Sequence, residues 1–264
     1  MFKFVYQDVD FAHKSDNASS PFDEYEKHMH SFFEILLFVK GDVDYHVEKE
    51  VRHLKPGDIV LINPGDFHFA TVNKNVLYER YVLKFPASFI TEDLQKRVKN
   101  IYPFFSTSRF TVELFRQLDD FAQNYSDDDK YLMFKCKVIE TIIYLANISQ
   151  DNKEIRNQDI VAVLIDYIQA HLKDNLTLQN ISEELNYSES YLSNIFKKTM
   201  KCSLMKYIRS KKIFLAQRMI QEGQKAIDVA EELNFNDYST FYRIYVRIIG
   251  TSPNNDKVIT KVTN

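Results

Sequence analysis

One short segment of this chain occurs twice, and this repeat constrains the fold more than any other feature. Ile181–Ser188 reads Ile-Ser-Glu-Glu-Leu-Asn-Tyr-Ser, and Val229–Asn236 reads Val-Ala-Glu-Glu-Leu-Asn-Phe-Asn. Each copy has helically spaced apolar residues followed by Asn, an aromatic residue and a polar residue. Asn tolerates left-handed backbone in a tight turn, and Ser or Asn is a strong helix N-cap. The repeat therefore predicts a helix and a tight turn at two places.

An amphipathic segment follows each copy, Glu189–Thr199 in the first case and Asp237–Ile249 in the second, with Ser188 and Asn236 as the expected caps. The apolar residues expected to pack inward are Leu192, Ile195 and Phe196 in the first unit, and Phe241, Ile244 and Tyr245 in the second. The residues expected to point outward are Ser190, Ser193, Asn194 and Lys197, and Tyr238, Ser239, Tyr242 and Arg243. This is a helix-turn-helix pattern, although an ordinary helical hairpin that binds no DNA can share it.

The segment Ser203–Glu222 between the two units is typical of one continuous helix. A helix of about 20 residues is about 30 Å long, close to the roughly 34 Å between successive major grooves on one DNA face. We expect helix-turn-helix units at about 177–199 and 226–249, joined by a helix over 203–222. A single chain would then reach two segments of the groove.

Charge is distributed unevenly along the chain, whose net charge is −3. Residues 1–155 contain 19 Lys+Arg and 25 Asp+Glu, whereas residues 156–264 contain 15 and 12. From Ser190 to Gln221 there are eight basic residues and no acidic one: Lys197, Lys198, Lys201, Lys206, Arg209, Lys211, Lys212 and Arg218. Such a run is expected where a protein meets a phosphate backbone, although a solvated helix face would also show it. Within the run we assign phosphate contacts to Lys198 and Arg209.

The first half of the chain has short apolar runs separated by turn residues. The runs are Phe33–Val39, Val43–Val47, Ile59–Ile62, Phe67–Val72 and Tyr78–Leu83. The turns are Gly41-Asp42, Pro56-Gly57-Asp58 and Pro64-Gly65-Asp66. Strands at this spacing predict an antiparallel barrel or sandwich. Helical spacing follows in Phe110–Tyr125 and Tyr131–Ile148.

These patterns predict an α+β chain of two domains, residues 1–150 and 159–264, with a polar linker at 151–158. No apolar run approaches the roughly 20 residues of a membrane-spanning helix, and the first residues do not resemble a secretion signal. The two cysteines lie far apart in sequence. We therefore expect a cytoplasmic protein without a membrane partner.

The second half resembles the DNA-binding domain of AraC/XylS-type transcription regulators over about residues 158–253. The matching segments are Tyr187–Lys198, Tyr207–Arg209, Ala216 and Phe235–Phe241. The resemblance implies two helix-turn-helix subdomains bridged by a long helix, with base contacts from the outward positions. Asn186, Lys201 and Asn234 stand where the family usually has Gly, and the second unit departs further at Val246 and Asn254. We expect the second unit to contribute less to base reading.

The first half resembles the sensor domains of the same regulators, including Leu54–Asp58 and Pro64–His68. Its His28-x-His30-x3-Glu34 segment, with Gly65-x2-His68, is also similar to the cupin pattern, in which these four residue types hold a divalent metal. The resemblance implies a cupin-like barrel that binds a small organic effector, for which a sugar is our expectation. We predict that His28, His30, Glu34 and His68 contact this effector and that no metal or other cofactor is held. A metal on the same four residues, or a purely structural polar patch, is the alternative.

The function predicted from these features is sequence-specific, effector-controlled transcription regulation, with activation as the expected mode. The expected partners are promoter DNA, RNA polymerase, the effector and a second copy of the chain, paired through the helices within Phe110–Ile148. Two other classes stay open at this point. One is a cupin metalloenzyme with an added helical domain, and the other is an interaction adaptor that keeps the helix-turn-helix shape without binding DNA.

Overall fold

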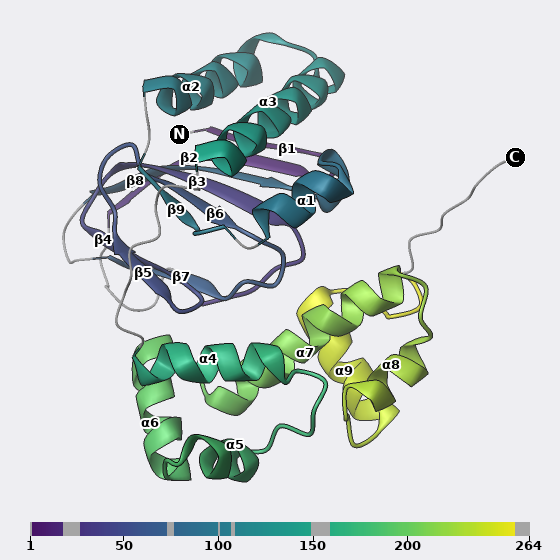
Figure 1. Cartoon of the computed structure of the whole chain (residues 1–264). Coiled ribbons are helices and arrows are strands. Elements are labelled where there is room, and N and C mark those ends of the chain that lie inside the picture. The colour runs from purple at the N-terminus through teal and green to yellow at the C-terminus, as the bar shows by residue number, and fades with distance from the viewer. Residues whose placement is uncertain are drawn as a thin grey trace, which may run out of the picture. The chain divides into compact units, whose positions relative to one another are not determined.

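The computed structural model describes residues 2–17, 27–72, 77–99, 101–106, 109–148 and 159–256. The chain forms two compact units, Met1–Arg156 and Asn157–Asn264 (Figure 1). The predicted linker at residues 151–158 lies outside the described residues, so its boundaries stay a prediction.

Two antiparallel sheets form the β portion of the first unit. The strands are β1 (Phe2–Tyr6), β2 (Val9–Asn17), β3 (Phe33–Lys40), β4 (Val43–Val47), β5 (Glu50–His53), β6 (Ile59–Ile62), β7 (His68–Val72), β8 (Leu77–Phe85) and β9 (Phe104–Phe105). The larger sheet has the order β1-β2-β8-β3-β6-β9, and the smaller one β5-β4-β7. All five strands predicted from the sequence are present, and β1, β2, β5 and β9 were not predicted.

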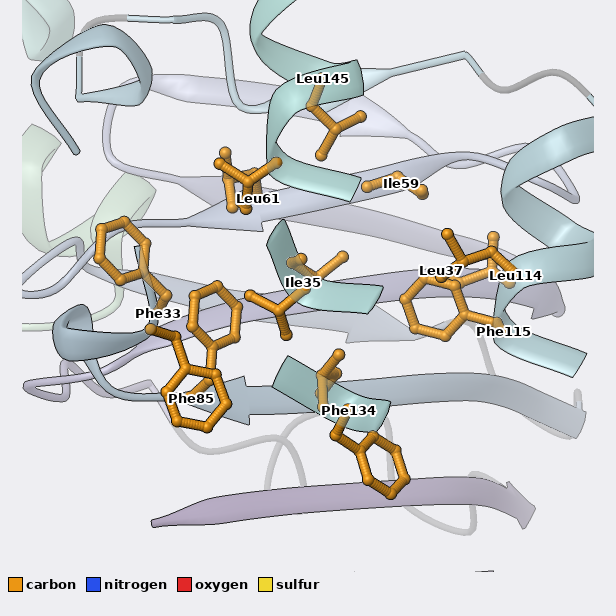
Figure 2. Close-up of a cluster of buried hydrophobic side chains, with 14 of the residues drawn as sticks. Phe33, Ile35, Leu37, Ile59, Leu61, Phe85, Leu114, Phe115, Phe134 and Leu145 are labelled. Carbon is orange, nitrogen blue, oxygen red and sulfur yellow. The ribbon is translucent and has the colours of Figure 1, made fainter. Parts of the chain in front are cut away.

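The larger sheet is covered on one face by helices and on the other by the smaller sheet (Figure 1). The helical elements are η1 (Ala87–Phe89), α1 (Glu92–Val98), α2 (Arg109–Asn124) and α3 (Asp127–Ile148). Figure 2 shows Phe33, Ile35 and Leu37 of β3 on the same side as Phe115 of α2 and Phe134 of α3. Because this sheet is buried on both sides, the apolar run Ile35–Val39 of β3 is continuous rather than alternating.

Alternation along β3 decides which residues enter the space between the two sheets. Leu36 and Phe38 pack there with Tyr45 and Tyr78. Glu34 has the same parity as Leu36, so its side chain points to the same face of the strand. The chain therefore carries a buried carboxylate on the inner wall of the β core.

The second unit is entirely helical within its described residues. Its helices are α4 (Ile160–Ala170), α5 (Leu178–Leu185), α6 (Glu189–Met200), α7 (Leu204–Gln221), α8 (Ala226–Glu232) and α9 (Tyr238–Ile249). The second half of α7 packs with α8 and α9 around Ile213, Ile220, Val229 and Phe241. Near the other end of α7, Tyr207 contacts Phe196 of α6, with ring centroids 5.3 Å apart. The long helix thus joins both helix-turn-helix subdomains, as the sequence predicts.

Candidate functional site

The first helix-turn-helix is formed by α5 and α6, and its turn depends on Asn186. Asn186 adopts φ 57° and ends α5 in the left-handed region. Ser188 then caps α6 by accepting a hydrogen bond from the backbone N–H of Tyr191. The turn has the geometry predicted from the repeat, because Asn tolerates this backbone at little cost.

The second helix-turn-helix differs from the first by one residue in its turn. Asn234 is again left-handed, at φ 56°. The predicted cap, Asn236, is wrong, because Asp237 occupies that position and its carboxylate accepts from the N–H of Thr240 at 2.7 Å. The extra residue moves the start of α9 to Tyr238. A short charged acceptor immediately before the helix supplies a stronger cap than an Asn one residue earlier.

Helix α6 ends at Lys201, which has φ 55° and lies in the left-handed region. A residue with a Cβ pays about 1–2 kcal/mol for this conformation. The family's usual Gly would avoid that cost. Lys201 therefore keeps the same turn but makes it less stable than Gly would.

The recognition helix of the first subdomain, α6, separates an apolar face from a polar face. Leu192 and Phe196 are fully buried, and Ile195 is half-buried. Of the predicted outward residues, Ser190, Asn194 and Lys197 are exposed and Ser193 is half-buried. Asn194 Nδ2 lies 3.4 Å from Ser190 Oγ, which places their polar groups side by side on one face.

Helix α9 repeats this division in the second subdomain. Phe241, Ile244 and Tyr245 are buried, as predicted. The outward residues Ser239, Tyr242 and Arg243 are exposed, and Tyr238 is half-buried. Arg243 Nη2 lies 3.3 Å from Thr240 Oγ1 on the preceding turn of the helix.

The basic run predicted for phosphate contact contains one residue that cannot serve that role. Lys198 and Arg209 are exposed, in line with the prediction. Lys212 is only 6% exposed, and its ammonium donates to the backbone carbonyls of Asp174 at 2.9 Å and Leu233 at 2.8 Å. An ammonium needs partners when buried, and these two carbonyls supply them. Including Lys212 in the phosphate footprint was therefore wrong.

Two features of this interface were not predicted from the sequence. The Tyr187 and Tyr191 rings stack at the start of α6, with centroids 5.4 Å apart, and both side chains are largely exposed. Their four-residue spacing was the available signal.

In the second subdomain, the Asp256 carboxylate accepts from the Tyr245 hydroxyl at 2.6 Å and from Gln217 Nε2 at 2.9 Å. Asp256 thus bonds the segment after α9 to both α7 and α9.

The four residues predicted for effector contact come together in the first unit. His28 pairs with His68 through a backbone bridge, while His30 precedes β3 and Glu34 lies on it. One ligand atom from each of the four lies within 4.8 Å of the others. His30, Glu34 and His68 are buried and His28 is half-buried.

Backbone carbonyls fix the orientation of two of these imidazoles. His30 Nδ1 lies 2.9 Å from Phe32 O, and His68 Nδ1 lies 2.9 Å from Asp66 O. Because a carbonyl only accepts, each Nδ1 carries a proton. His30 Nε2 then faces Glu34 Oε2 at 3.1 Å. This contact requires a proton between the two atoms or a cation that both coordinate.

Burial and charge leave the cluster rich in hydrogen-bond acceptors. Burial lowers the pKa of His68 to about 3, so its ring is neutral at neutral pH. Its Nε2 is buried and has no hydrogen-bond partner among the described residues. Burial by itself raises the pKa of Glu34. The hydrogen bond from His30 and the positive charge of Lys84 outweigh burial and lower the pKa to about 2. The site offers an anionic carboxylate and an imidazole lone pair.

Two kinds of ligand suit this donor set. Imidazole with carboxylate is typical of Fe, Mn, Ni or Zn sites, and these residues fit such an ion by type and proximity. The same acceptors can take hydrogens from the hydroxyl groups of a polar organic molecule. Of the aromatic residues that could line a ligand space, Tyr45 of β4 and Tyr78 of β8 pack between the two sheets, whereas Tyr81 packs in the helix-side core.

Comparison with known proteins agrees with this architecture. The family model described as the AraC-like ligand binding domain matches residues 17–128, and that of a helix-turn-helix domain matches residues 181–256. The "Uncharacterized HTH-type transcriptional regulator YbfI" of Bacillus subtilis (strain 168) is 24% identical, over 82% of this chain and 81% of that protein. The "Probable transcriptional regulator LumQ" of Photobacterium leiognathi is 26% identical, over 86% and 89%. A crystal structure of ToxT from Vibrio cholerae O395 is 13% identical, covers 94% of this chain and 96% of that one, and has a TM-score of 0.38.

A ligand-binding β domain followed by two helix-turn-helix units defines a sequence-specific DNA-binding transcription regulator under effector control. The chain belongs to the AraC/XylS family of transcriptional regulators. In the described ranges, no helix combines the length and apolarity that a membrane span requires.

Proposed function

We propose that α6 and α9 are the recognition helices that this regulator inserts into DNA grooves. The observation that carries the proposal is the exposed polar face of each helix, opposite a buried apolar face and directly after a tight turn. Base contacts come from Ser190, Ser193, Asn194 and Lys197 on α6 and from Tyr238, Ser239, Tyr242 and Arg243 on α9. Promoter DNA is the target.

Base reading is assigned mainly to α6. Asn194 is exposed near the middle of the helix and can pair bidentately with adenine. Lys198 and Arg209 are exposed cations that meet phosphates, which sets affinity rather than sequence choice. The longer turn before α9 changes how that helix approaches a groove, so α9 contributes less discrimination.

The effector binds within the first unit, against His28, His30, Glu34 and His68. His68 Nε2 and the Glu34 carboxylate are buried acceptors, and a hydroxyl-rich molecule such as a sugar supplies donors to both. Phe32, whose ring stacks on His30 with centroids 3.9 Å apart, adds a flat apolar surface next to these acceptors. We assign no catalytic step and no resident cofactor to this cluster.

A homodimer forms through α3. Leu132 and Ile143 are 61% and 45% exposed, and Cys136 and the half-buried Ile139 lie between them at helical spacing. This apolar stripe is unusual for a solvated helix. Pairing in the cytoplasm places two DNA-binding units on one promoter, next to RNA polymerase, and the expected outcome is activation.

Sequencing the genomic DNA fragments that the full-length protein retains at near-physiological salt tests this function. Enrichment of a common sequence upstream of genes supports regulation. An interaction adaptor would retain no fragments and show no dependence of DNA binding on salt concentration. A metalloenzyme would instead show stoichiometric metal and turnover.

A further inference from the structure

The buried lysine of the second unit connects segments from both helix-turn-helix subdomains. Lys212 lies in the middle of α7, and its Nζ donates to Asp174 O, which follows α4, and to Leu233 O, at the end of α8. The two acceptors belong to different subdomains. Burial lowers the pKa of Lys212, opposed by the nearby negative charge of Asp174. One ammonium therefore bonds to both subdomains at once.

Two more polar contacts join the same segments at the surface. Lys173 Nζ pairs with Glu232 Oε1 at 2.6 Å. Asn234 Nδ2 donates to Lys173 O at 2.6 Å. Together with the bonds of Lys212, these contacts form a latch between the end of α4 and the turn that precedes α9. Asn234 belongs to that turn and is held in the left-handed region, so the latch engages the element that positions α9.

Apolar packing is incomplete beside the latch. A cleft of about 510 Å³ opens there, lined by Asn175 from the first subdomain and by Ile227, Ala230, Asn234 and Tyr238 from the second, among others. Side chains that line an open cleft do not pack against each other, so they cannot fix the distance between the two subdomains. Beside the cleft, the orientation of the second subdomain relative to the first therefore depends on the hydrogen bonds of the latch. Those of Lys212 are charge-assisted.

We propose that Lys212 is a positioning residue that fixes the orientation of the second helix-turn-helix relative to the first. Two recognition helices can enter successive grooves together only if their separation and angle match the pitch of DNA. With the latch closed, contact by one helix places the other at high effective concentration at its own groove segment. The effect on DNA binding rests on the proposed function of α6 and α9 as two recognition helices. The relative orientation of the two subdomains in the free protein does not.

Distance measurement by double electron–electron resonance tests the orientation without DNA. Spin labels are attached to full-length protein at Glu184→Cys on α5 and Asp228→Cys on α8, both exposed positions, with Cys136→Ser and Cys202→Ser. We expect one narrow distance distribution in this background. Lys212→Met should broaden or split it, Lys212→Arg should keep it narrow, and Lys225→Met, an exposed lysine at the start of α8, should leave it unchanged.

A distribution for Lys212→Met as narrow as that of the parent protein would overturn the proposal. If circular dichroism shows Lys212→Met to be unfolded, the test passes to Lys212→Gln, which replaces the ammonium with a shorter, uncharged amide. Broadening in that variant supports the proposal, and a distribution as narrow as that of the parent protein overturns it.

DNA spacing provides the functional readout. The probe is a duplex that wild-type protein selects from a random library, together with the same duplex lengthened by two base pairs between the contacted segments. Wild-type affinity should fall about tenfold on the lengthened duplex, and that of Lys212→Met should change less than about threefold. Equal sensitivity to spacing in both proteins counts against the proposal. If no duplex is selected at all, the DNA-binding proposal fails while the distance measurement still decides the latch.

Discussion

Asn194 and Arg243 occupy the same position in the two recognition helices, each at the same number of residues after its N-cap, Ser188 or Asp237. Both are exposed and face away from the buried aromatic core of their subdomain. Each contacts a hydroxyl on the preceding turn of its helix, Ser190 for Asn194 and Thr240 for Arg243, and the two differ in that Arg243 follows the longer turn. Equivalent positions with different side chains allow the two subdomains to be compared directly.

Replacing Arg243 with Ala should cost less discrimination than replacing Asn194 with Ala. Arg243 should contribute less to base reading for two reasons. It follows the longer turn before α9, and an Arg side chain can contact a phosphate instead of a base. Competition binding with duplexes altered at each contacted base pair measures this. A larger specificity loss for Arg243→Ala would show that α9 is the principal reader.

Neutralising Lys198 or Arg209 with Gln should weaken binding to all sequences alike and reduce the slope of log affinity against log salt by about one unit. Both side chains are exposed cations in the basic run. Lys96→Gln, an exposed lysine on α1, is the matched control and should leave the slope unchanged. A loss confined to one sequence would instead assign the residue to base contact.

Asp237 gives the second subdomain a pH-dependent cap. The hydrogen bond from the N–H of Thr240 lowers the pKa of Asp237 below its ordinary value of 3.8. A carboxyl whose pKa is lower in the folded state than in the unfolded state stabilises the fold at any pH above its unfolded-state pKa. That stabilisation is lost as the pH falls through the folded-state pKa. Wild type should therefore exceed Asp237→Asn in thermal midpoint at pH 7, and this advantage should decline below pH 3.8 and vanish once the pH falls below the lowered folded-state pKa. An advantage that persists in strong acid would mean that the carboxylate is not the cap.

Protein purified without chelator should carry only substoichiometric metal. The His30 and Glu34 side chains contact each other directly at 3.1 Å, so a proton shared between them satisfies both atoms without a metal ion. Elemental analysis of wild type, His30→Ala and Glu34→Ala checks this. A stoichiometric ion in wild type that is lost in both variants would contradict it and would revive the metalloenzyme alternative.

Sedimentation of a fragment comprising residues 1–150 should show a dimer at micromolar concentration. Leu132→Glu with Ile143→Glu should convert it to a monomer, because the apolar stripe of α3 would then carry charge. Val112→Glu, at an exposed apolar position on α2, is the control. A wild-type fragment that stays monomeric would remove α3 as the interface.

The parts of this fold that were predictable from the sequence are those set by neighbouring residues. Asn186 and Asn234 mark left-handed turns because few residue types tolerate that backbone. Strands β3, β4 and β6 are bounded by turn residues and have nearly continuous or alternating apolar runs. The edge strand β1 and its neighbour β2 were missed because charged residues interrupt their apolar patterns.

The rest depends on contacts between distant segments. Lys212 looks like any other member of a basic run, and its burial follows from two carbonyls that belong to Asp174 and Leu233. The role of Asp256 likewise depends on its meeting Tyr245. The gathering of His28, His30, Glu34 and His68 was expected only through a family resemblance, and the fold brings them together.

Binding of wild type and Asn194→Ala to a selected duplex and to its scrambled counterpart, at several salt concentrations, tests the central claim most directly. If α6 reads bases through Asn194, the substitution should cost about 1–3 kcal/mol on the selected duplex and little on the scrambled one. The salt slopes of the two proteins should stay equal, because no phosphate contact is lost. Equal losses on both duplexes would contradict the account and show that a different face of the helix meets the groove.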